Sequence, residues 1–143
     1  VFLVGVGLIG STLLEQIKQQ TAFLRNHRRL ELKVVGLANS KHMVFDTAGI
    51  DLDRWRALLD AGEPFTMPRF VEYMKNYNLS NALFVDNTAS ADVAAHYEAI
   101  LDASIAVSTP NKIAASSDYE RYQRLKALAA KRNVTWKYET NVG

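Results

Sequence analysis

Val1-Phe2-Leu3-Val4-Gly5-Val6-Gly7-Leu8-Ile9-Gly10 opens the chain, and this stretch decides the fold. Its apolar start, Val1 to Val4, is typical of a strand buried within a parallel sheet. The glycines then fit the G-x-G-x-x-G pattern, and the segment that follows, from Ser11 to Glu15, is typical of a helix start. A strand, a glycine turn and a helix in this order predict a dinucleotide-binding unit. The alternative is an ordinary tight turn between a strand and a helix.

Each glycine of this turn has its own physical task in a dinucleotide site. Gly5 permits the tight turn, Gly7 lets the backbone approach a pyrophosphate, and Gly10 allows the helix to pack closely on the strand. The N-terminus of the helix presents free N–H groups and a partial positive charge to the phosphates. We therefore predict a cofactor-binding turn made of Gly5, Val6, Gly7, Leu8, Ile9 and Gly10.

Composition argues against several classes of protein. The chain has 143 residues, of which 48% are hydrophobic and 22% charged, as in an ordinary globular domain. Its 17 basic and 15 acidic residues leave a net charge of +2, so we expect no nucleic-acid partner. No apolar run approaches the length of a bilayer span, so we expect no membrane partner. The absence of cysteine excludes disulfides and thiol catalysis and favours a cytoplasmic location.

Apolar strand-like segments alternate with amphipathic helical segments along the whole chain. The expected strands cover residues 1–4, 32–38, 82–88, 105–109 and 134–139, and the expected helices cover 8–27, 51–61, 68–77, 89–103 and 117–132. This alternation predicts one α/β domain of the Rossmann type over residues 1–143, with a doubly wound, mainly parallel sheet and helices on both faces. The chain starts inside a strand without Met and ends just after another strand, so we expect a fragment of a longer polypeptide.

Polar residues follow the second expected strand, where the adenine ribose of a dinucleotide should lie. A site selective for NAD usually has Asp or Glu there, whereas this chain has Asn39, Ser40 and Lys41. Asn39 and Ser40 are suited to hydrogen-bond a 2′-phosphate, and Lys41 is suited to neutralise it. These residues favour NADP over NAD as the cofactor. The alternative is a polar turn without a role in binding.

Two further loops should reach the same edge of the sheet, because ligands bind beyond the carboxyl ends of parallel strands. Thr88, Ala89 and Ser90 follow the third expected strand and should face the cofactor; the alternative role for Thr88 or Ser90 is helix capping. Lys112 follows the next strand, where its ammonium group could polarise a carbonyl or pass a proton. The alternative for Lys112 is a solvated lysine in a loop.

Several longer motifs appear together and in a family order. They are Gly5-Val6-Gly7-Leu8-Ile9-Gly10, Gly36-Leu37-Ala38-Asn39-Ser40-Lys41, Val85-Asp86-Asn87-Thr88-Ala89-Ser90, Ser108-Thr109-Pro110-Asn111-Lys112 and Tyr138-Glu139-Thr140-Asn141-Val142-Gly143. With these motifs the chain resembles the nucleotide-binding domain of homoserine dehydrogenase, particularly the form fused behind aspartokinase. The resemblance covers essentially the whole chain, and its Thr-Pro-Asn-Lys and Glu-Thr-Asn-Val-Gly segments are far more specific than the glycine motif.

The resemblance implies an activity and roles for particular residues. The family interconverts L-homoserine and L-aspartate 4-semialdehyde with NAD(P), on the route to threonine, methionine and isoleucine. By resemblance, Lys112 lies beside the nicotinamide as a cofactor-binding and catalytic residue, and residues 88–90 contact the cofactor. Glu139 and the carbonyl of Val142 are implied to bind a monovalent cation, typically sodium.

The same resemblance implies that much of the enzyme lies elsewhere. The substrate-binding and dimerisation region would follow Gly143, and an aspartokinase region could precede Val1. We therefore expect this chain alone to bind dinucleotide without turnover, and the full-length enzyme to be a homo-oligomer acting on a small molecule. One enzymatic rival, aspartate-semialdehyde dehydrogenase, uses a catalytic thiol that this stretch lacks. A rival of another class is a non-catalytic regulatory module that senses dinucleotides.

Overall fold

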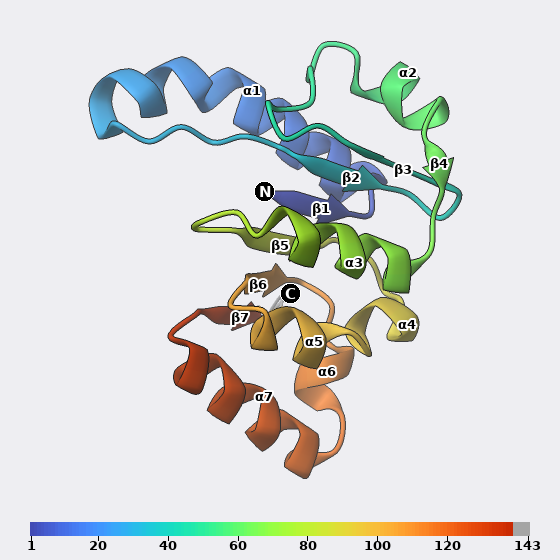
Figure 1. Cartoon of the computed structure of the whole chain (residues 1–143), viewed down its shortest axis with the longest axis vertical. Helices are drawn as coiled ribbons and strands as arrows, with labels where there is room; N and C mark the ends of the chain where they lie inside the picture. Colours follow the sequence, from blue (N-terminus) through green and yellow to red (C-terminus); the bar gives the residue numbers. More distant parts are fainter. Residues whose placement is uncertain (139–143) are drawn as a thin grey trace.

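A seven-stranded sheet forms the centre of the computed structural model, which describes residues 1–138 (Figure 1). The strand order is β4-β3-β2-β1-β5-β6-β7. The strands are β1 (Phe2–Val4), β2 (Gly36–Ala38), β3 (His42–Phe45), β4 (Glu63–Pro64), β5 (Leu83–Asp86), β6 (Ala106–Thr109) and β7 (Trp136–Tyr138). From β2 to β7 across the sheet, neighbouring strands are parallel, with Leu3 paired to Leu37 on one side and to Val85 on the other. The predicted Rossmann-type α/β fold is confirmed.

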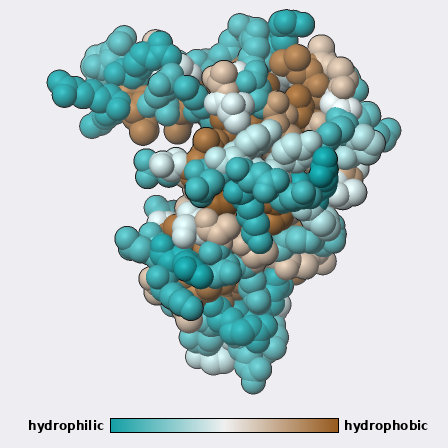
Figure 2. All heavy atoms as spheres, viewed as in Figure 1, coloured by the Kyte–Doolittle hydropathy of each residue, from teal (hydrophilic) through white to brown (hydrophobic). Residues whose placement is uncertain are grey.

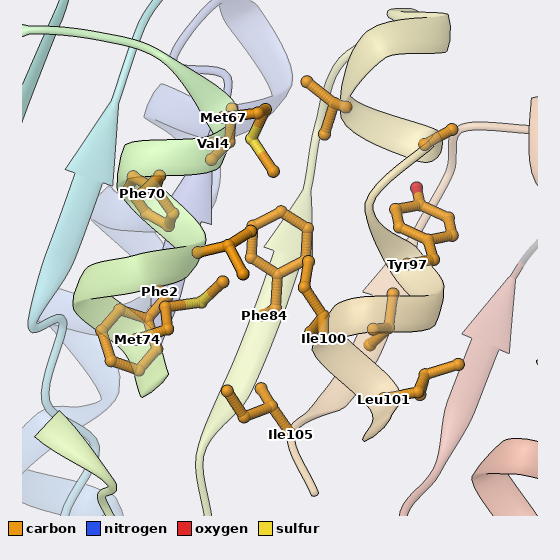
Figure 3. Packing of buried hydrophobic residues seen from close by; sticks show 14 of the residues in the cluster. Phe2, Val4, Met67, Phe70, Met74, Phe84, Tyr97, Ile100, Leu101 and Ile105 are labelled. Carbon is orange, nitrogen blue, oxygen red and sulfur yellow. The ribbon is translucent and has the colours of Figure 1, made fainter. Parts of the chain in front are cut away.

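Helices cover both faces of this sheet, as predicted. They are α1 (Leu8–Arg28), α2 (Trp55–Asp60), α3 (Met67–Tyr77), α4 (Ala91–Ala94), α5 (Tyr97–Asp102), α6 (Ile113–Ser116) and α7 (Tyr119–Arg132). Successive strand residues point to opposite faces, and this divides the core in two. Leu3 packs with Leu14 and Ile17 of α1 on one face. Phe2 and Val4 pack on the other face, against α3 and α5 (Figure 3).

The core on the α3 and α5 face is built around aromatic side chains. Phe70 of α3 lies edge-on to Phe84 of β5, with ring centroids 6.2 Å apart, and Phe84 lies near Tyr97 of α5. These rings are fully buried. In Figure 3, the hydroxyl oxygen of Tyr97 is the single polar side-chain atom among the labelled residues. It therefore needs a hydrogen-bond partner, and that partner lies in the site described below.

β3 pairs antiparallel with β2, and β4 pairs antiparallel with β3. Neither strand was among those expected from the sequence. The side chain of Asn39 closes the turn between β2 and β3, because its Oδ1 accepts hydrogen bonds from the backbone N–H groups of Lys41 and His42 at 2.8 and 2.7 Å. Such an Asx turn reverses the chain at once and pairs β3 with β2. The sheet is thus mainly parallel with an antiparallel edge.

Two expected helices also differ in detail. The helix expected over residues 89–103 is broken into α4 and α5, and a short helix, α6, precedes α7. The hydroxyl of Ser90 caps α4 by accepting from the N–H of Val93. The ring of His96 then contacts the carbonyl of Asp92, at 2.8 Å from Nδ1, where the chain turns into α5.

The strand order places a crevice above β1. From β1 the chain runs to β2 on one side and later to β5 on the other, and ligands bind at such a switch point beyond the carboxyl ends of the strands. The outer surfaces of the helices in Figure 2 are largely hydrophilic. In residues 1–138, no helix combines the length and the apolar character that crossing a membrane requires.

Candidate dinucleotide site

The glycines of the β1–α1 turn have three different surroundings. Gly5 has φ +98°, and a Cβ built on it would lie 2.9 Å from the backbone carbonyl of Asn87. A Cβ on Gly10 would lie 1.9 Å from the carbonyl oxygen of Gly5. A Cβ on Gly7 would meet nothing within 4 Å. Gly5 and Gly10 are thus required by the turn itself, whereas the open space at Gly7 suits the close approach of a ligand.

The N-terminus of α1 is left without a side-chain cap. Gly7 is the N-cap residue, and the first turn of α1 contains no acidic residue. The hydroxyl groups of Ser11 and Thr12 donate to the carbonyl of Leu8, so they do not occupy the N–H groups. The free N–H groups and the helix dipole fit an anionic pyrophosphate. Leu8, the first residue of α1, is 85% exposed on this turn.

Two hollows flank the glycine turn at the switch point. Both are lined by Gly5, Asn39, Ser40 and Thr88, and their volumes are about 500 and 540 Å³. The first extends over the N-terminus of α3 and the start of α4, and the second extends over α2. Together with the uncapped helix, these hollows fit a dinucleotide that crosses the turn.

The predicted residues after β2 occupy this edge, with one qualification for Asn39. Its Oδ1 is used by the β2–β3 turn, which leaves only its Nδ2 group for a ligand. Ser40 lines both hollows, and Lys41 is exposed beside it without lining either. The segment is therefore a polar turn that borders the candidate site.

Sequence reasoning missed two contributions to these hollows. Arg56 of α2 lines the second hollow together with Ser40, and its guanidinium lies 4.3 Å from the ring centroid of Trp55. The segment from Phe65 to Pro68 lines the first hollow. The amphipathic pattern of residues 51–61 predicted a helix there. Only the packing of α2 beside the β2 turn shows that Arg56 faces the cofactor edge.

The loop after β5 is held by a buried carboxylate. The hydroxyl and backbone N–H of Thr88 donate to Oδ1 of Asp86 at 2.6 and 2.8 Å, and the N–H of Ser90 donates to the Thr88 hydroxyl. Thr88, Ala89 and Ser90 all line the first hollow. Thr88 therefore shapes the loop and also borders the site, while Ser90 caps α4 as well.

Lys112 lies beyond the end of β6, at the N-terminus of α6. Its backbone carbonyl accepts from the N–H and hydroxyl of Ser116, at 2.8 and 2.7 Å. Its side chain is exposed, lines neither hollow and forms no ion pair with the part of the chain that the structure describes. The neighbouring Asn111 is buried, so the loop is anchored while the ammonium group remains available.

The predicted cation ligands, Glu139 and Val142, lie outside the described residues. Within residues 1–138, no group of three or more His, Asp or Glu side chains could hold a metal ion.

Several known proteins are similar to this chain in sequence. The family described as homoserine dehydrogenase, NAD binding domain, matches residues 5–139. A chloroplastic bifunctional aspartokinase/homoserine dehydrogenase 1 from Arabidopsis thaliana is 41% identical over 99% of the chain, which spans 16% of that protein. The bifunctional enzyme from Haemophilus influenzae is 36% identical, and the chain covers 17% of it. A homoserine dehydrogenase from Schizosaccharomyces pombe is 30% identical, and the chain covers 39% of it.

Solved structures agree on the fold. A hyperthermophilic archaeal homoserine dehydrogenase in complex with NADPH superposes with a TM-score of 0.74 at 23% identity, over 98% of this chain and 43% of that one. The enzyme from Thermoplasma acidophilum gives 0.71 at 22% identity, over 96% and 42%. The family match extends over nearly the whole chain and confirms the predicted class of cofactor. The chain therefore belongs to the family of homoserine dehydrogenase NAD-binding domains.

Proposed function

We propose that this chain binds NADP or NAD and forms the cofactor half of an enzyme that interconverts L-homoserine and L-aspartate 4-semialdehyde. The observation that carries the proposal is the open space at Gly7 beside the uncapped N-terminus of α1, within a chain that matches the family over residues 5–139. When bound, the nicotinamide supplies hydride transfer. The protein has to hold that ring and manage the charge on the substrate oxygen.

Different residues of the chain bind the dinucleotide and act on the substrate carbonyl. The N–H groups of the first turn of α1 bind the pyrophosphate, and Gly7 keeps the approach free of side chains. Residues 88–90 hold the dinucleotide from the β5 side of the crevice. Lys112, next to the buried Asn111, presents its side chain at the edge where the substrate carbonyl would be polarised.

The remaining parts of the enzyme are also proposals. The chain spans 15% to 17% of the bifunctional relatives, so we propose that the substrate-binding and dimerisation region follows it and an aspartokinase region precedes it. The full-length protein would then be a homo-oligomer that acts on a small molecule, and Glu139 with Val142 would contribute to a sodium site. The lack of cysteine favours a reducing compartment such as the cytoplasm.

One observation favours a second candidate function, a dinucleotide-sensing module without catalysis. Lys112 lines neither hollow, and a sensor would not need a lysine beside the nicotinamide. The two functions differ in what the loss of Lys112 should do.

A lysine substitution in the complete protein that the gene encodes tests the proposal. Lys112→Ala should lower kcat for homoserine oxidation by at least about 100-fold, because an essential proton-transfer or charge-stabilising group is lost. The affinity for the dinucleotide, measured by calorimetry, should change little. Lys131→Ala, at an exposed lysine of α7, is the matched control. Binding without any turnover in the wild type would favour the sensor, and turnover that survives Lys112→Ala would remove this residue from the mechanism.

A further inference from the structure

The carboxylate of Asp86 is fully buried at the carboxyl end of β5 and accepts hydrogen bonds from four donors. Oδ1 accepts from the backbone N–H and the hydroxyl of Thr88, at 2.8 and 2.6 Å. Oδ2 accepts from the hydroxyl of Tyr97 at 2.5 Å and from Nδ2 of Asn111 at 3.1 Å. No Lys or Arg among the described residues forms an ion pair with this carboxylate. Burying such a group is costly, and the four donors offset that cost.

Asn111 extends this network to the loop that carries Lys112. Its Nδ2 group also donates to the carbonyl of Ser90, at 3.1 Å. Its backbone N–H donates to the hydroxyl of Thr109, which in turn donates to the backbone carbonyl of Asp86. Asp86 and Asn111 are 25 residues apart in the sequence. One carboxylate thus ties the 88–90 loop, which lines a hollow of the site, to the 110–112 loop, which presents Lys112.

Tyr97 joins this network to the hydrophobic core. Its ring packs near Phe84, and its hydroxyl reaches Oδ2 of Asp86. Burial of the ring and the nearby charge of Asp86 raise the pKa of the Tyr97 hydroxyl, so this group stays protonated and acts as a donor. The hydroxyl has a single proton, and its 3.1 Å contact with Thr109 is therefore secondary to the bond with Asp86.

We propose that Asp86, acting through Tyr97 and Asn111, is a positioning residue that holds the cofactor loop 88–90 and Lys112 in one fixed arrangement. The inference rests on the proposed function, because a fixed position of Lys112 relative to loop 88–90 matters for catalysis only if the chain binds a dinucleotide there. A carboxylate is needed at this position because both of its oxygens accept hydrogen bonds and neither donates one. An asparagine would turn an N–H group toward one of the donors.

The two oxygens of Asp86 accept hydrogen bonds from different donors, so a mutation can remove a bond to one oxygen and leave the bonds to the other in place. Tyr97→Phe removes a donor to Oδ2 and leaves both bonds from Thr88 to Oδ1 in place. In the complete protein, Tyr97→Phe should lower kcat at least about tenfold and change the dissociation constant of the dinucleotide less than about threefold. In the reverse direction, where L-aspartate 4-semialdehyde is reduced, the primary deuterium isotope effect with NADPH deuterated at the transferred C4 position should rise, because hydride transfer becomes more rate-limiting. Tyr77→Phe, at a half-buried tyrosine packed against the same core, is the control.

A second readout does not depend on turnover. Hydrogen exchange of the Asn111 backbone amide in the unliganded protein should become at least about fivefold faster in Tyr97→Phe, while that of the Thr88 amide should stay unchanged. If Tyr97→Phe does not fold, Asn111→Ser is used, since it removes the bonds from Nδ2 to Oδ2 of Asp86 and to the carbonyl of Ser90.

The outcomes separate this inference from the proposed function. A lower melting temperature with unchanged kcat and isotope effect would overturn the positioning role and leave a purely structural network. An equal loss of kcat in Tyr77→Phe would also overturn it. A wild-type protein that neither binds dinucleotide nor oxidises homoserine would instead contradict the proposed function.

Discussion

At the residue scale, Gly7 and Gly10 belong to the same motif but should respond differently to the same substitution. Gly7→Ala should fold normally, because its Cβ meets only open space, and should weaken dinucleotide binding at least about tenfold by intruding on the pyrophosphate. Gly10→Ala should lower the melting temperature, because its Cβ would overlap the carbonyl of Gly5. Thermal unfolding and calorimetric titration of both variants measure the contrast. Equal losses of stability would show that Gly7 is a structural glycine.

The residues around the β2 turn allow a test of cofactor preference. Arg56 and Ser40 line the same hollow, and Lys41 is exposed beside them. If they bind the 2′-phosphate of NADP, Arg56→Ala and Lys41→Ala should each weaken NADP binding about tenfold, with little effect on NAD. The nearby Arg54 lines a different hollow, and Arg54→Ala is the control. Equal losses for NADP and NAD would refute a role in reading the 2′-phosphate.

At the scale of elements, an ion pair between α5 and α7 should give stability that depends on pH. Arg132 donates to Oδ1 of Asp102 at 3.1 Å from Nε and 2.8 Å from Nη2. The hydrogen bond and the charge of Arg132 hold the pKa of Asp102 below its ordinary value of 3.8. The stabilisation is therefore fully present above about pH 4 and is lost as the pH falls through the lower pKa of the folded state.

Asp102→Asn should lower the melting temperature slightly at pH 7 and leave it unchanged near pH 2. The effect should be small because both partners are exposed to solvent. Arg132→Gln and the double variant complete a double-mutant cycle. The coupling energy between Asp102 and Arg132 should disappear at low pH. A coupling that persisted at pH 2 would contradict the assignment to this ion pair.

The elements differed in how far they could be predicted. Apolar periodicity predicted a helix over residues 8–27 and a strand over residues 1–4, and the structure has them as Leu8–Arg28 and Phe2–Val4. The β3 strand was missed because its pairing depends on the Asx turn at Asn39, where a side chain replaces a backbone partner. The division between α4 and α5, where the ring of His96 contacts the carbonyl of Asp92, was missed because the sequence pattern over residues 89–103 is continuously helical.

At the scale of the whole molecule, dinucleotide binding should stabilise the fold. The candidate site joins β1, β2, β5 and the helices on both faces, so a ligand that binds it favours the folded state over the unfolded chain. At a ligand concentration 100 times the dissociation constant, the gain should be about 2.7 kcal/mol. For a domain of this size, this gain raises the melting temperature by roughly 8 °C. Thermal scans with NADP should show the shift for the wild type, and Gly7→Val should show none.

The sequence by itself determined the fold class, the family and the segments that meet at the cofactor edge. It could do so because strand and helix periods, glycine turns and short motifs are local patterns along the chain. Tertiary structure alone decided that Arg56 borders the site, that Gly7 is open while Gly10 is enclosed, and that Asp86 bonds Asn111, 25 residues further along the chain. These features depend on which side chains the folded sheet brings together from distant parts of the sequence. Local sequence patterns do not show such contacts.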